Sequence, residues 1–294
     1  MDGMETNTAA PHGARVHALV RKGWLTNQHG AWAMMLVPIL VGSILGGFTW
    51  PQAVLTFAWL AAFFYFSALG LWIKVAASAR KRAGGEHLDP KRRAAVSRRQ
   101  ARYRNALITY ASLAALGALV LVLIKPELLW WAPALAACFG VAVWEMWRDA
   151  DRSFLARTSA VTASQLLTPI AFSLGSHPAD WSRMWLATGV LTLYFVGTIP
   201  YVKTLIRERG SRTWIRGSIA YHGVVLAVAA AAAGFGVLSW WIVSLWALLL
   251  LRAVAFPAWS HKLGKPLRPA VVGFTEFAVS TAVVLVLVLP STLF

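Results

Sequence analysis

Long apolar stretches alternate with short polar stretches along the whole of this 294-residue chain. A helix that spans a membrane needs roughly 20 mostly apolar residues. These stretches are continuous and lack the period-two alternation of barrel strands, so they predict helices. Nine segments are predicted, at about 31–49, 53–79, 105–124, 128–147, 158–176, 184–206, 217–238, 240–259 and 270–293.

The predicted fold is therefore an all-α, polytopic membrane helical bundle with about nine transmembrane helices. The composition agrees, because 58% of the residues are hydrophobic and only 13% are charged, unlike an ordinary soluble domain. Residues 1–24 are polar and lack the apolar core of a signal peptide, which predicts a mobile cytoplasmic N-terminal tail. Residues 25–294 are predicted to form a single transmembrane domain.

Basic residues fall almost entirely on one side of the nine segments. With the N-terminus in the cytoplasm, only Lys125 and Arg183 of the 28 lysines and arginines lie on the opposite side. This asymmetry predicts a multi-pass protein of the cell (cytoplasmic) membrane, with its C-terminus outside. Topology accounts for most of the net charge of +17, so the charge does not indicate a nucleic-acid partner. The predicted partners are the lipid bilayer and its anionic headgroups.

Two local patterns predict details of the helices. Asp89-Pro90, in the basic 80–104 connection, is typical of a helix start, with an aspartate N-cap and proline at the first helical position. The basic residues that follow indicate either a solvated topology anchor or a cap over a substrate. Gly42 and Gly46 form a small-xxx-small pair that favours close helix contact.

Charged and imidazole side chains within the segments lie at one predicted depth. Such groups are costly in a bilayer and usually face the bundle interior or a wet cavity. They lie in or near the cytoplasmic ends of their segments, and they are Lys74, Glu145, Lys203, Arg252, Glu276, His29 and His222. Together they predict a pocket that opens to the cytoplasm; the alternative for each residue is a locally satisfied polar group between helices.

The predicted pocket is basic and suits an anionic or amphipathic, lipid-like ligand. Glu276 is expected to pair with Arg252 or hold a ligand hydroxyl, and His29 or His222 to hydrogen-bond or shuttle a proton. Tyr201 shares a helix face with Tyr194 by helical spacing. The ligand-binding candidates are Asn27, His29, Lys74, Tyr201, Lys203, Arg207, Glu208, His222, Arg252 and Glu276.

Glu145, Asp149 and Asp151 are weak candidates for a Mg²⁺ site near the end of the fourth segment. Arg148 stands three residues after Glu145, and Arg152 three after Asp149, so ion pairs within the helix or capping of the loop are the favoured interpretation. No P-loop, dinucleotide fingerprint or zinc spacing occurs, and the sequence names no cofactor and no reaction.

The residues also carry a family resemblance. The segment Asn27 to Met34 reads NQHGAWAM, and with Val37-Pro38 it resembles the start of YwiC-like integral membrane proteins. The stretches 194–198 and 201–209, and later Arg252-Ala253 with Pro257, are similar to the same family.

A more distant resemblance is to the UbiA prenyltransferases. It implies a UbiA-like arrangement of nine helices around a cytoplasm-facing cavity, and an isoprenoid or quinone-like ligand. The aspartate-rich motifs of that family are absent here. Lys74 with 80–82, and Lys203 with 207–209, stand in their places, so the usual Mg²⁺-dependent transfer is not expected.

Three classes of function follow. The leading hypothesis is a UbiA-like enzyme or binder of an isoprenoid or other lipid-like ligand. The alternatives are a small-anion or metabolite transporter, which usually carries broken helices or repeats near the midplane, and an assembly partner of a membrane complex.

Overall fold

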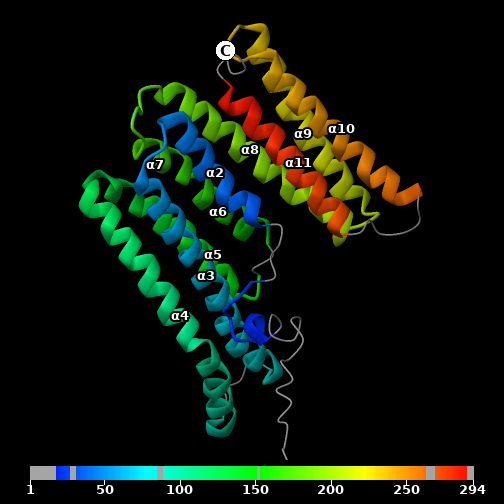
Figure 1. The fold of residues 1–294 in the computed structure, drawn as a ribbon. Helices are drawn as coiled ribbons and strands as arrows, with labels where there is room; N and C mark the ends of the chain where they lie inside the picture. Colours follow the sequence, from blue (N-terminus) through cyan, green and yellow to red (C-terminus); the bar gives the residue numbers. More distant parts are fainter. Residues whose placement is uncertain (1–17, 27–30, 85–88, 151–152, 263–268, 290–294) are drawn as a thin grey trace, which may run out of the picture.

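The computed structural model describes residues 18–26, 31–84, 89–150, 153–262 and 269–289, and the regular elements in these ranges are all helices (Figure 1). Their bounds are α2 Ala31–Gly46, α3 Trp50–Arg82, α4 Pro90–Ile124, η1 Pro126–Trp131, α5 Ala132–Trp147, α6 Phe154–Gln165, α7 Leu167–Ser173, α8 Trp181–Ile206, α9 Arg212–Gly234, α10 Trp240–Lys262 and α11 Pro269–Val288.

Seven helices in the described ranges are long and apolar enough to cross a membrane. They are α3, α4, the continuous η1–α5 pair, α8, α9, α10 and α11. The all-helical, multi-pass architecture predicted from the sequence is thereby confirmed. The other two predicted segments differ in length, since α2 has 16 residues and the fifth segment is divided between α6 and α7.

Successive helix ends meet at two opposite ends of the bundle. At one end, the Thr49 hydroxyl donates to the Leu174 carbonyl over 2.7 Å, and the Lys125 amino group donates to the Ser173 carbonyl over 2.6 Å. At the other end, Lys81 of α3 lies 3.8 Å from Asp149, which follows α5. The helices from α3 to α7 therefore run alternately up and down, with α6 and α7 together making one pass, as the segment pattern predicts.

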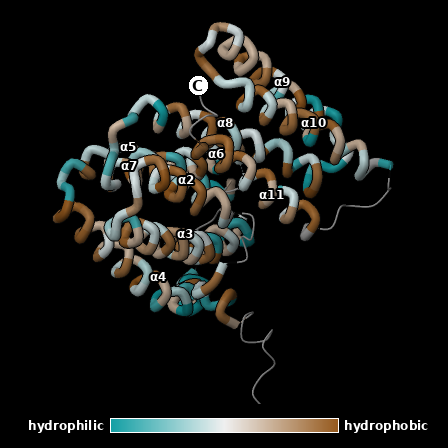
Figure 2. The backbone as a smooth tube through the Cα atoms, turned by 45° about the horizontal axis from the view of Figure 1, so that its top comes forward, coloured by the Kyte–Doolittle hydropathy of each residue, from teal (hydrophilic) through white to brown (hydrophobic). Residues whose placement is uncertain are grey.

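The α3–α4 pair extends beyond the other helices at one end of the molecule (Figure 1). The predicted helix start is confirmed, because the Asp89 carboxylate caps α4 by accepting the Arg92 N–H over 2.7 Å, with Pro90 at the first helical position. The capped start extends α4 to 35 residues, so most of the 80–104 connection is helical. Hydrophilic residues gather where α4 begins and where α10 ends (Figure 2).

Residues just before the first membrane segment pack on this pair. Gly23 lies against Tyr103 and Ala68, and the Tyr110 hydroxyl donates to the Trp24 carbonyl over 2.7 Å. The mobile tail predicted for 1–24 stays a prediction for residues 1–17, which lie outside the described ranges.

Gly42 and Gly46 bring α2 into backbone contact with α7, as the small-xxx-small pattern predicts. A Cβ atom on Gly42 would overlap the Thr168 carbonyl oxygen, and one on Gly46 would overlap the Phe172 backbone. Gln52 closes this contact from α3, because its side-chain amide donates to the Ala171 carbonyl over 2.9 Å.

The helix is interrupted between α6 and α7 at Leu166. Pro169 has no N–H and cannot donate to the Gln165 carbonyl, which removes one hydrogen bond from a continuous helix. Near the break, the Ser164 hydroxyl turns to the Met34 carbonyl of α2. The sequence signal for this break was the run of polar residues in the fifth segment.

Candidate functional site

A groove lies between the projecting parts of α3 and α4, with a volume of about 580 Å³. Helical spacing directs one face of each helix toward it, and its two walls mix long cations with small or apolar side chains. We call it the α3–α4 groove; its residues are Leu71, Lys74, Val75, Ser78, Ala79 and Arg82 on α3, and Arg92, Ala95, Val96, Arg99 and Tyr103 on α4.

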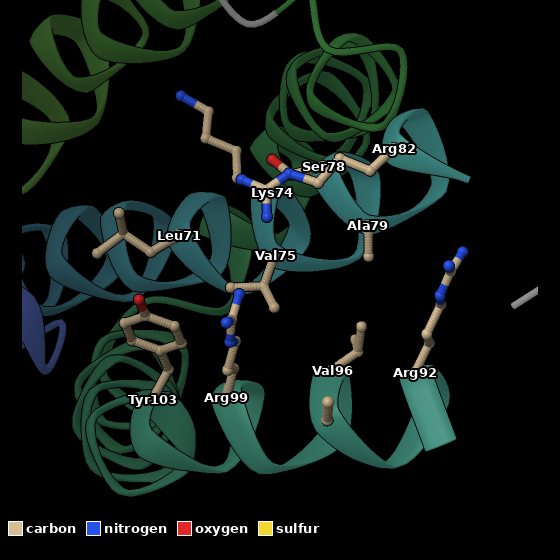
Figure 3. Close-up of a pocket in the computed structure, with 11 residues that line it drawn as sticks. Leu71, Lys74, Val75, Ser78, Ala79, Arg82, Arg92, Val96, Arg99 and Tyr103 are labelled. Atoms are coloured by element: carbon tan, nitrogen blue, oxygen red, sulfur yellow. The ribbon is translucent and has the colours of Figure 1, made fainter. Parts of the chain in front are cut away.

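The groove is basic and amphipathic. Four of its eleven residues are lysine or arginine and none is acidic. Figure 3 shows Arg92 and Arg99 rising from α4 toward α3, with the Arg99 side chain under Val75, while the Lys74 amino group points away from α4. Such a surface offers guanidinium donors to an anion and apolar contact to a hydrocarbon chain.

A second polar site is buried among α8, α9, α10 and α11. The Arg252 Nη1 atom donates to the Glu276 carboxylate over 2.5 Å, and the Arg252 side chain is only 3% exposed. The Arg252 guanidinium carbon lies 4.1 Å from the centre of the Tyr201 ring, which is fully buried. We call this site the Arg252 cluster; its residues are Tyr194, Tyr201, Ser218, His222, Arg252, Glu276 and Ser280.

The rest of the cluster surrounds this ion pair. The Tyr194 hydroxyl lies 2.9 Å from the Ser280 hydroxyl and interacts with both charged groups. The His222 Nδ1 atom lies 2.8 Å from the Ser218 carbonyl oxygen, which can only accept a hydrogen bond, so Nδ1 carries the proton. The Nε2 atom of the neutral ring then holds a lone pair.

Lys203 and its neighbours form a separate group at the end of α8. The Lys203 amino group stacks 4.0 Å from the centre of the Trp214 ring. Arg207 and Glu208 are close enough to act on it electrostatically, and both follow the last turn of α8. This group is held by a cation–π contact and nearby charges.

The weak metal candidates carry ion pairs instead. Buried Glu145 lies 3.8 Å from Arg148, the first of the two ion pairs expected from the sequence, and Arg152 of the second pair lies outside the described ranges. Asp149 faces Lys81, and its φ of 58° closes the end of α5. Asp151 lies outside the described ranges. No group of three or more metal-ligating side chains occurs in the part of the chain that the structure describes.

Comparison with known proteins identifies the family of the chain. Residues 25–172 match the protein family described as YwiC-like protein. The chain belongs to the YwiC-like family. A YwiC protein of Bacillus subtilis (strain 168), named there as uncharacterized, is 25% identical over 209 residues, covering 68% of this chain and 74% of that protein. An uncharacterized protein of Haemophilus influenzae is 24% identical over 271 residues, covering 92% of this chain and 98% of its own. No solved structure matches the chain significantly.

In this YwiC-like chain, the predicted site residues separate into three groups. Tyr201, Arg252, Glu276 and His222 come together in the Arg252 cluster. Lys203, Arg207 and Glu208 stand at the end of α8, and Lys74 stands in the α3–α4 groove. Asn27 and His29 lie outside the described ranges.

Sequence reasoning missed the α4 wall of the groove, where the basic run showed no clear apolar stripe. The signal was spacing, because Arg92, Val96, Arg99 and Tyr103 recur at steps of three and four. The basic start of α4 shows no apolar stripe because arginines and apolar residues share the helix face that lines the groove.

Proposed function

We propose that this YwiC-like protein binds an anionic, lipid-like ligand in the α3–α4 groove, at the cytoplasmic face of the cell membrane. The observation that carries the proposal is the lining of the groove, four cationic residues among apolar ones and no carboxylate. An anionic headgroup would accept hydrogen bonds from Arg99 and from the Nη groups of Arg92, whose Nε lies 3.3 Å from the Asp89 carboxylate, since guanidinium groups match phosphate and carboxylate oxygens in pairs. The hydrocarbon part would lie on Leu71, Val75 and Val96.

The position of the groove supports a ligand drawn from the bilayer. The apolar part of α4 begins near residue 105, and the basic turns that carry Arg92 and Arg99 precede it in the chain. From Leu71 to Arg82 the α3 wall is about 16 Å long, at roughly 1.5 Å per residue. A lipid could therefore keep its chain near the membrane surface while its headgroup contacts the arginines.

The finer topology belongs to the same proposal. Nine crossings, a cytoplasmic N-terminus and a UbiA-like arrangement would place the groove in the large connection after the second crossing. The alternation of helix ends and the position of Lys125 opposite the basic turns of α4 support this orientation. An isoprenoid diphosphate is one ligand with the required chemistry, and it would link the chain to UbiA-like proteins without a metal-binding aspartate motif.

Native mass spectrometry of the full-length protein tests the proposal. The delipidated protein is exposed to phosphatidylglycerol or phosphatidylcholine, and bound lipid is counted. Phosphatidylglycerol is expected to bind preferentially, and the Arg92→Ala/Arg99→Ala variant to bind it at least about tenfold more weakly, since a hydrogen bond to a charged group contributes about 1.5–3 kcal/mol.

The matched control is Arg98→Ala/Arg102→Ala, which removes the same charge from the same helix outside the groove. Each cation near a membrane attracts anionic lipid by about 1 kcal/mol without a specific contact. An equal loss in both variants would contradict a groove site. Recovery of a stoichiometric protein partner in place of lipid would favour the assembly-partner alternative.

A further inference from the structure

We propose that the Arg252 cluster is a second binding site, for a small oxyanion held inside the helical bundle. It lies on α8–α11, whereas the groove lies on α3 and α4, so the inference does not depend on the proposed function. The cluster has buried hydrogen-bonding atoms with no partner in the part of the chain that the structure describes, and these atoms carry the proposal.

The open donors of Arg252 have the geometry of an oxyanion site. Nη1 is used by Glu276, while Nε and Nη2 have no hydrogen-bond partner among the described residues. The Nε–H and one Nη2–H point the same way, forming the side-on fork of the guanidinium. Two oxygens of a carboxylate, carbonate or phosphate fit this fork with two parallel hydrogen bonds, which a spherical halide cannot do.

Neighbouring groups complete the site. The Tyr201 hydroxyl is fully buried and without a partner among the described residues, next to the guanidinium that stacks on its own ring. The His222 Nε2 atom is also unpartnered; it lies close to Gly197, one turn before Tyr201 on α8. A hydroxyl donor next to the guanidinium and a ring acceptor near Gly197 favour an oxyanion that carries an acidic proton, such as bicarbonate or dihydrogen phosphate.

Charge balance agrees with this class of ligand. The charges of Arg252 and Glu276 cancel, so a bound monoanion would give the site a net charge of −1. The site is buried, since Arg252 is only 4% exposed. Uptake of a proton at His222 Nε2 would restore neutrality. The titratable groups that face the His222 ring are Tyr221 of α9, with its ring centre 5.5 Å away, and Arg252 of α10.

The test measures thermal stabilisation of the full-length protein in phosphatidylcholine nanodiscs. Sodium bicarbonate, sodium phosphate and sodium chloride are compared at constant ionic strength, with bulky gluconate as the reference anion. We expect saturable stabilisation by an oxyanion but not by chloride. Tyr201→Phe should weaken it by about tenfold or more, because it removes only a hydroxyl hydrogen bond to a charged ligand.

Tyr221→Phe is the matched control, since the Tyr221 hydroxyl donates to the Leu193 carbonyl outside the cluster. Tyr201→Phe is expected to fold, because its hydroxyl has no partner to lose among the described residues. Equal oxyanion affinity in wild type and Tyr201→Phe would overturn the proposal. So would an equal loss in both variants, or the absence of saturable stabilisation, which would mean that the open donors hold water only.

A lipid headgroup carries the same phosphate chemistry, so a second arm uses phosphatidylglycerol nanodiscs without added anion. Stabilisation that appears there and depends on Tyr201 would identify the lipid headgroup as the oxyanion. Stabilisation confined to free bicarbonate or phosphate would identify a soluble ion, and would support the transport hypothesis.

Discussion

Arg252 of α10 and Glu276 of α11 meet over 2.5 Å inside the bundle, and Glu276 is itself four-fifths buried. The two charges lie on different helices, so the pair joins α10 to α11. In a dry interior, the loss of one partner is far more costly than the loss of both, because the remaining charge is unpaired.

We therefore expect Glu276→Ala to lower the free energy of unfolding by about 3–5 kcal/mol. The double variant Arg252→Met/Glu276→Leu should recover most of this loss, since it removes both charges and keeps the volume. Thermal unfolding in detergent micelles measures both. A double variant as unstable as the single one would show that the pair stabilises the fold through more than charge balance.

Gly42 predicts a steric limit on the α2–α7 contact. Gly42→Ala should destabilise the protein by about 1–3 kcal/mol, because its Cβ would meet the Thr168 carbonyl oxygen, and a backbone atom cannot rotate away. The yield of monodisperse protein and its thermal midpoint are the measurements.

Gly140→Ala is the control, since a Cβ on Gly140 of α5 has no neighbour within 4 Å. This variant should match wild type or gain up to about 1 kcal/mol from helix propensity. Equal destabilisation by the two alanines would argue against the α2–α7 packing.

The hydrogen bonds of the Gln52 side chain are expected to stabilise the fold. Its side chain accepts the Thr49 N–H over 2.8 Å and donates to the Gly47 and Ala171 carbonyls over 3.0 and 2.9 Å. Gln52→Leu should lower stability by about 1–3 kcal/mol or more, because it leaves buried polar groups unpaired. Gln100→Leu, which removes one exposed hydrogen bond, should have a much smaller effect in the same unfolding assay.

Chemical labelling tests the orientation. In a Cys138→Ser background, Ser97→Cys marks the basic part of α4, and Glu127→Cys marks η1, just beyond the opposite end of that helix. A membrane-impermeant maleimide should label position 127 in right-side-out vesicles and position 97 in inverted vesicles, because the basic side is expected in the cytoplasm. Labelling of position 97 in right-side-out vesicles would reverse the topology.

Features that involve only one or two helices could be predicted from the sequence. Asp89 caps α4 as its position before Pro90 predicts, and the expected pairing of Glu276 with Arg252 is present. Depth along a helix follows from residue counting, and the common level of the polar residues stays a prediction.

The neighbours of each helix were not readable, because helical periodicity gives the face of a residue but not what packs on it. Lys74 and Arg252 share a predicted level, yet Lys74 lines the α3–α4 groove and Arg252 lies among α8–α11. A single pocket built from both was therefore beyond what the sequence determines.

The divided α6–α7 segment has a consequence for biosynthesis. Alone, α6 and α7 extend only about 18 and 10 Å, and only together, through the helical backbone of Leu166, do they approach the roughly 30 Å of the hydrocarbon core. The 16 residues of α2 extend about 24 Å, and its two glycines fit the backbone of α7. Because α2 leaves the ribosome long before α7, the face of α2 that carries Gly42 and Gly46 stays in the translocon or in lipid until α7 is made. A chain that stops before Leu167 would keep that face unfilled, and the membrane proteases that remove unfinished proteins would have a feature to recognise.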